Sequence, residues 1–203
     1  VARGGGVGGT SAGTAIQGDL VYDACGGSVT SSQALANPYH AAITFTYGFF
    51  AWPSLASVIT DTHFVPRDRM GRTMAFVARQ LQDGRATAPL GLAVNEGTSL
   101  VVDRLGLATV MGAGPVYMVL GDHPPAVCQP GVPLTFVDYK IWKLGPGATF
   151  DLAKRPACGY YLRSVTDGVV SSDPYSGTPA PCGSPTPTPT PTPSPTPTPT
   201  PTP

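Results

Sequence analysis

The last twenty residues constrain the fold most, because they alternate proline with threonine or serine from Ser184 to Pro203. Ten of the 24 prolines lie in this segment. A proline at every second position fixes φ and removes backbone donors, so helix and sheet are both excluded. We expect a disordered but semi-rigid linker over residues 184–203, about 60 Å long at ~3.1 Å per residue. Folding is therefore confined to the residues before it, and their number suits one domain.

Charge and hydropathy exclude several classes of partner. Basic and acidic residues balance at 12 each, so we expect no general attraction to nucleic acid or to anionic membranes. No apolar run reaches the ~18 residues that a membrane span requires. Because the chain begins at Val1, the sequence says nothing about a signal peptide.

The four cysteines, at positions 25, 128, 158 and 182, lack the CxxC spacing of a zinc site. Cys158 and Cys182 are candidates for a disulfide that closes the C-terminal segment, and four unpaired thiols are the alternative. Together with the Thr/Pro linker, the cysteines favour an extracellular or cell-surface location. No residue pattern indicates a metal or another cofactor, so we expect none.

The hydrophobic period changes along the chain from helical to alternating. Apolar residues recur at helical spacing from Arg69 to Asp83, and Gly84 follows as a cap, so a helix with a core-facing stripe is predicted there. Residues 25–60 resemble an insertion or loop that ends in a short buried segment. Later segments read as strands separated by turns, at 92–94, 99–102, 108–111, 116–120 and 134–144. A helix followed by strands predicts an α/β sheet that finishes in antiparallel strands.

Residues 9–13, Gly-Thr-Ser-Ala-Gly, fit the G-x-S-x-G nucleophile elbow with Ser11 as the nucleophile. A helix starting at Ser11 would point its positive end at the hydroxyl, and Ala12 would give one N–H to an oxyanion hole. Two other interpretations of these glycines are weaker. A dinucleotide fingerprint over residues 4–9 lacks a preceding strand, and a phosphate-binding P-loop would need a lysine.

A hydrolytic serine needs a base and an acid that orients the base. Among three histidines, His63 is the best candidate, because it follows an apolar segment where a strand should end. Glu96 is the only glutamate and also follows a predicted strand. The alternatives are a histidine that pairs only locally and an exposed turn carboxylate.

Three arginines, Arg67, Arg69 and Arg72, lie at the start of the predicted helix, where the helix dipole disfavours cations. Their placement suggests bidentate binding of a substrate carboxylate or amide. The alternative is ion pairing with Asp61, Asp68 and the helix that follows.

In this order, the glycine-serine block, the Asp-Thr-His-Phe segment with its arginines, and Gly91–Thr98 resemble cyanophycinases of the S51 serine peptidase family. The resemblance covers roughly residues 3–155 and implies a three-layer α/β/α, class I glutamine amidotransferase-like (flavodoxin-like) fold. It implies a triad of Ser11, His63 and Glu96 that hydrolyses cyanophycin to β-Asp-Arg dipeptides. The same match assigns substrate binding to Asp61, Thr62, Arg67, Arg69 and Arg72.

The chain departs from the family pattern at several positions. Thr62 stands where the family usually has glutamine, and Asn95 and Gly97 replace acidic residues. The resemblance also implies that the N-terminal half of the domain is missing. The expected division is therefore a C-terminal portion of the peptidase domain over 1–155, an irregular extension over 156–183, and the linker over 184–203.

Three hypotheses of function follow. The first is a cyanophycin-hydrolysing serine peptidase, which is supported by the serine, histidine and glutamate in family order. The second is a related dipeptidase for short aspartyl peptides, motivated by Thr62 and the long 25–60 segment. The third is a secreted, non-catalytic module that binds peptide through its arginines. All three expect a peptide or polypeptide partner, and they leave open a homodimer and a further domain beyond the linker.

Overall fold

The computed structural model describes residues 4–182, so the predicted linker lies outside the described residues. Its longest helix, α3 (Met70–Gln82), confirms the helix predicted from the apolar spacing. Met70, Met74 and Val77 are fully buried, as expected for a core-facing stripe. The helix ends before Gly84, whose φ of 65° is readily adopted only by glycine.

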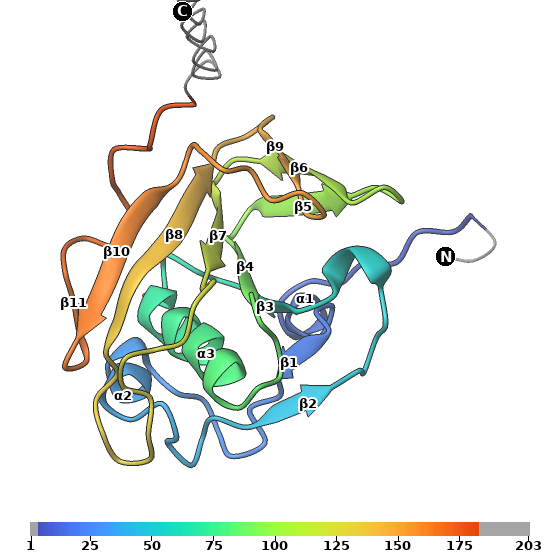
Figure 1. Ribbon diagram of the computed structural model, residues 1–203. Helices are drawn as coiled ribbons and strands as arrows, with labels where there is room; N and C mark the ends of the chain where they lie inside the picture. The colour runs from blue at the N-terminus through green and yellow to red at the C-terminus, as the bar shows by residue number, and fades with distance from the viewer. Residues whose placement is uncertain (1–3, 183–203) are drawn as a thin grey trace, which may run out of the picture.

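An eight-stranded sheet forms the centre of the fold, in the order β11-β10-β8-β7-β4-β3-β1-β2 (Figure 1). Three neighbouring strands run parallel, and antiparallel strands flank them on both sides. The parallel strands are β1 (Leu20–Tyr22), β3 (Val58–Asp61) and β4 (Leu90–Val94). The antiparallel strands are β2 (Phe45–Tyr47), β7 (Val116–Leu120), β8 (Phe136–Leu144), β10 (Tyr161–Thr166) and β11 (Val169–Val170).

Alternating side chains divide the core into two layers, one on each face of this sheet. Ala93, Tyr117 and Val119 join the cluster beneath α3 and the short helix α2 (Ser31–Ala36). Leu92 and Met118 point to the opposite face. That face is covered by a three-stranded sheet of β5 (Thr98–Val102), β6 (Leu107–Gly112) and β9 (Thr149–Asp151).

Helix α1 (Ala12–Ala15) contacts β3, where the hydroxyl of Thr60 donates to the carbonyls of Thr14 and Ala15 at 2.8 and 2.9 Å. Thr60 alternates with Ile59, which belongs to the α3 side, so α1 lies on the face opposite α3. The predicted α/β class, with helices on both faces and antiparallel strands at the C-terminal end, is confirmed.

Two segments contain more regular structure than we expected. Residues 25–60, expected as a loop or insertion that ends in a short buried segment, contain α2, β2 and the 3₁₀ turn η1 (Pro53–Leu55), and the expected buried segment forms β3. A capping box between Thr30 and Gln33 begins α2. Residues 156–183, expected to be irregular, contain β10 and β11, because β10 pairs with β8 and extends the large sheet. The domain division given above stays a prediction.

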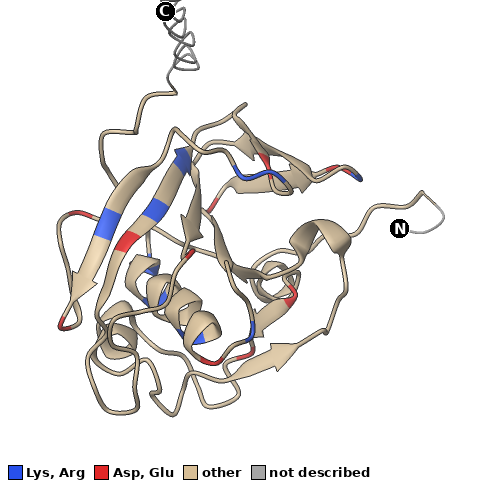
Figure 2. Ribbon diagram, viewed as in Figure 1, with Lys and Arg blue, Asp and Glu red and all other residues tan. Residues whose placement is uncertain are grey.

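The predicted disulfide between Cys158 and Cys182 is present, whereas Cys25 and Cys128 are free thiols. Figure 2 shows basic residues on α3 and charged residues of both signs on β8 and at the turn after β5. Among residues 4–182, no helix is long and apolar enough to cross a membrane.

Candidate active site

Ser11, His63 and Glu96 lie together in hydrogen-bonding order. Ser11 Oγ lies 3.0 Å from His63 Nε2, and His63 Nδ1 lies 2.8 Å from Glu96 Oε1. His63 is partly buried, whereas the Glu96 side chain keeps 55% of its surface exposed. These three side chains are separated by 52 and 33 residues in sequence and form one chain of hydrogen bonds, which we call the relay.

The parallel strands explain why His63 and Glu96 meet. β3 ends at Asp61 and β4 ends at Val94, and the two strands are paired in parallel register. Their carboxyl ends consequently lie at the same edge of the sheet, which is where open α/β sheets collect functional side chains. Both residues occupy the first turn beyond their strands.

The backbone of Ser11 and of His63 is strained. Ser11 has φ 52° and ψ −119°, and His63 has φ 49°, a region that residues with a Cβ rarely adopt. Each such conformation costs of order 1–3 kcal/mol and persists only where the surrounding structure enforces it. Backbone strain at both ends of the Ser11–His63 contact is typical of a functional site.

The turn around Ser11 requires a glycine at position 9. A Cβ on Gly9 would lie 2.3 Å from the backbone of Gly13, so residue 9 must be glycine in this conformation. The hydroxyl of Thr14 donates to the Gly9 carbonyl at 2.6 Å and closes the turn. Among residues 4–182, the N–H of Ala12 donates to no acceptor, so it is free to bind an oxygen near Ser11. Residues 4–10, which precede this turn, contain no strand.

Asn95 connects the turn after β3, which carries His63, to the turn after β4, which carries Glu96. Its Oδ1 accepts a hydrogen bond from the N–H of Val65 at 2.9 Å, and its Nδ2 donates to the carbonyl of Pro115 at 3.1 Å. Residues 63–69, which we call the His63 turn, are thereby tied to Asn95, the residue before Glu96. We noted Asn95 only as a departure from the family pattern, although an amide directly after a strand was a signal for this role.

Asp61 and Arg72 form a buried ion pair beneath the site, with side chains only 6% and 5% exposed. Arg72 Nε donates to Asp61 Oδ2 at 2.7 Å, and its Nη2 donates to Asp61 Oδ1. Arg69 Nη1 donates to the carbonyl of Thr62 at 2.7 Å and to Asp61 Oδ1 at 3.2 Å. Burial lowers the pKa of the Arg69 guanidinium. These contacts favour the alternative of internal ion pairing, and direct substrate binding by the four residues stays a prediction.

Arg67 differs from the other two arginines because it is exposed. Its N–H donates to the carbonyl of His63 at 3.2 Å, so it lies on the same tight turn as the histidine. Within the described part of the chain, its guanidinium makes no hydrogen bond or ion pair. Arg67 is therefore the arginine of the cluster that is best placed to meet a ligand in solvent.

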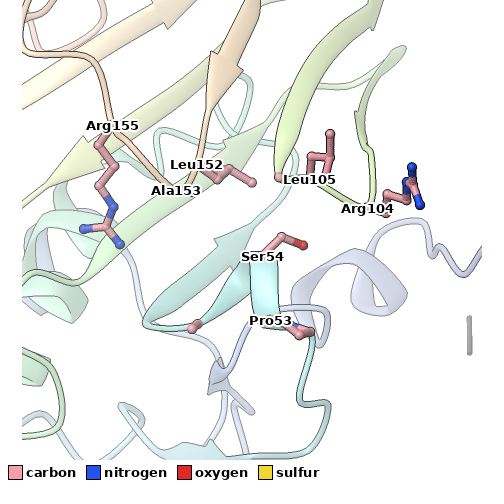
Figure 3. A pocket seen from close by; sticks show the side chains of 9 residues that line it. Pro53, Ser54, Arg104, Leu105, Leu152, Ala153 and Arg155 are labelled. Atoms are coloured by element: carbon pink, nitrogen blue, oxygen red, sulfur yellow. The ribbon is translucent and has the colours of Figure 1, made fainter.

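Two cavities lie near the surface. One, of about 330 Å³, borders the relay and is lined by Glu96, Asn95, Tyr117, Lys143 and neighbouring residues. The larger, of about 430 Å³, lies between η1 and the turns after β5 and β9, and Figure 3 shows Arg104 and Arg155 at its sides. None of the predicted site residues lines the larger cavity.

The chain is similar to cyanophycinases from two cyanobacteria, and it matches no family model. It is 31% identical over 151 residues to the cyanophycinase of Trichormus variabilis and to that of Nostoc sp.. The match covers 72% of this chain and 45% of each relative, so the chain spans less than half the length of the relatives it matches. The comparison supports a distant relationship to cyanophycinases.

Proposed function

We propose that this chain carries the catalytic residues of a serine peptidase of the S51 type, with Ser11 as nucleophile, His63 as base and Glu96 as the acid that orients it. The observation that carries the proposal is the Ser11–His63–Glu96 relay, with separations of 3.0 and 2.8 Å. A nucleophile bonded to a base that is itself oriented by an acid is the arrangement that acyl transfer requires.

The reaction proceeds through an acyl-enzyme. Glu96 accepts a hydrogen bond from Nδ1–H of His63, which leaves Nε2 free to take the proton of Ser11 Oγ. Oγ attacks the substrate carbonyl, and the Ala12 N–H donates to the oxyanion that forms. His63 then gives its proton to the leaving amine as the carbon–nitrogen bond breaks. Water, deprotonated by His63, attacks the ester, and His63 returns that proton to Oγ as the carbon–oxygen bond breaks and Ser11 is regenerated.

The substrate we propose is cyanophycin or a related β-aspartyl peptide. The similarity to cyanophycinases supports this class, and so does the exposed Arg67 beside His63, because a guanidinium binds carboxylates bidentately. We further propose an extracellular or cell-surface location, which the Cys158–Cys182 disulfide supports.

The test measures hydrolysis by the full-length protein of the β-Asp-Arg polymer and of short aspartyl peptides. Ser11→Ala should lower kcat by about 10⁴-fold or more, whereas the exposed Ser28→Ala should leave it unchanged. Undiminished turnover in Ser11→Ala would refute the proposal. Turnover of short peptides alone would keep the peptidase and replace the polymer as its substrate.

A further inference from the structure

The segment that follows β11, residues 171–182, crosses back to the site and is fixed at several points; we call it the C-terminal strap. Tyr161 Oη donates to the carbonyl of Pro174 at 2.8 Å, and Arg163 Nε donates to that of Asp173 at 2.9 Å. The Cys158–Cys182 disulfide ties its far end to the residues before β10. The strap therefore has a defined path along the large sheet.

Tyr175 is the strap residue that reaches the His63 turn. Its Oη donates to Asp68 Oδ1 at 2.8 Å and accepts from the N–H of Met70 at 3.0 Å. The Met70 N–H is one of the first donors of α3, which the helix itself cannot satisfy. One phenol thus bonds the end of the His63 turn and the start of the helix that carries Arg72.

The ring and the carbonyl of Tyr175 contact residues next to the site. Its ring meets the rings of Phe64 and Tyr117 edge-on, with centroids 5.9 and 5.7 Å apart, and both partners are almost completely buried. Its carbonyl accepts from Tyr117 Oη and Lys143 Nζ, each at 3.2 Å. Tyr117 and Lys143 both line the cavity beside Glu96.

We propose that Tyr175 is a positioning residue for the peptidase reaction: it holds the turn from His63 to Arg69 in the strained conformation that directs His63 toward Ser11. The proposal rests on the proposed function. It adds a residue that lies 107 positions downstream of Asp68, the turn residue to which it donates its hydrogen bond. The other contacts of the turn are its own backbone bonds, the Asn95 contact, the hydroxyl of Ser31, which donates to the carbonyl of Asp68, and the guanidinium of Arg69, which donates to the carbonyl of Thr62.

The structure supplies a matched control at the other end of α3. Tyr39 Oη donates to Asp83 Oδ1 at 2.5 Å, so Tyr39→Phe removes a tyrosine–aspartate bond that is far from His63 along the helix. Asp68→Asn offers a conservative partner, because the amide oxygen still accepts from Tyr175 and asparagine tolerates the positive φ of residue 68.

The experiment compares kcat, KM and the rate at which a fluorophosphonate labels Ser11, at a temperature well below unfolding. Tyr175→Phe should lower kcat and the labelling rate together, by about fivefold to tenfold, because His63 loses its alignment. Tyr39→Phe and Asp68→Asn should stay within about twofold of wild type. An unchanged kcat in Tyr175→Phe, or an equal loss in Tyr39→Phe, would overturn the proposal.

A second measurement separates this proposal from the peptidase assignment. Hydrogen exchange of the amides of residues 64, 65 and 67–70 should be faster in Tyr175→Phe than in wild type and in Tyr39→Phe. If the wild type neither hydrolyses peptides nor reacts with the probe, the peptidase assignment fails, and exchange alone decides whether Tyr175 holds the turn. Unchanged exchange in Tyr175→Phe overturns the positioning role in either case.

Discussion

The two ends of α3 carry the same kinds of side chain in different surroundings. At the N-terminal end Arg72 pairs with Asp61, and Tyr175 bonds Asp68. At the C-terminal end Arg79 pairs with Asp83 at 2.9 Å, and Tyr39 bonds the same carboxylate. The side chains of Asp61 and Arg72 are 6% and 5% exposed, whereas the side chain of Asp83 is 24% exposed.

Burial decides what each set of contacts does. A buried pair that loses one partner leaves an uncompensated charge in a medium of low dielectric, whereas a surface pair is screened by water. The buried set also lies directly beneath the His63 turn, because Asp61 ends β3 two residues before the histidine. We therefore expect changes at the N-terminal end of α3 to affect the His63 turn, and changes at the C-terminal end to affect only the stability of the helix end.

The largest effect is expected from removing the carboxylate at each end. Asp61→Ala should lower the free energy of unfolding by about 3–5 kcal/mol, because the Arg72 guanidinium is left buried and unpaired. Asp83→Ala should cost about 1 kcal/mol or less. Urea denaturation of the two variants measures both values. Equal losses in the free energy of unfolding would contradict the larger contribution assigned to the buried pair.

A smaller effect is expected from the asparagines that tether the backbone near each end. Asn95→Ala removes the acceptor for the Val65 N–H and should lower kcat by about tenfold, because the His63 turn loosens. Asn37→Ala is the matched control, since Asn37 Oδ1 accepts from the N–H of Tyr39 near the C-terminal end. It should lower stability by about 1 kcal/mol and leave kcat unchanged. A similar loss of kcat in both variants would contradict a specific role of the N-terminal end of α3 in holding the His63 turn.

The smallest effect is expected from the tyrosines at high pH. Burial, together with the hydrogen bond to Asp83, raises the pKa of Tyr39 from 10 to about 12, and burial also raises the pKa of Tyr175. The folded protein then keeps protons that the unfolded chain has lost. The stability that each tyrosine contributes is therefore full below pH 10 and falls as pH rises, up to about pH 12 for Tyr39.

Unfolding in urea between pH 9 and 11.5 checks this expectation. Tyr39→Phe and Tyr175→Phe should each make the decline shallower. A decline as steep as that of wild type in both variants would contradict the assigned environments.

The sequence predicted those parts of the fold that depend on local pattern. The stripe of Met70, Met74 and Val77 predicted α3, and the apolar runs around Leu92 and Met118 predicted β4 and β7. In the 25–60 segment the capping box at Thr30 was a signal for α2 that we did not use. β10 was missed because it is stabilised by pairing with β8, and a distant pairing leaves no local pattern.

His63 and Glu96 could be predicted because each follows a strand that the sequence reveals, and Ser11 could be predicted because it stands in the G-x-S-x-G pattern. What the sequence could not show is how the arginines divide their contacts. Arg67, Arg69 and Arg72 look equivalent in the sequence, but the fold buries Arg72 against Asp61 and leaves Arg67 in solvent. Tyr175 could not be predicted either, because only the path of the strap brings it to Asp68.

The most direct test of the central claim is to follow fluorophosphonate labelling of the full-length protein by intact mass and peptide mapping. If Ser11, His63 and Glu96 act as one unit, the wild type gains a single adduct on Ser11. His63→Ala should then slow its formation by about 100-fold or more, because the serine loses its base. Labelling at an unchanged rate in His63→Ala, or an adduct on a residue other than Ser11, would contradict the account.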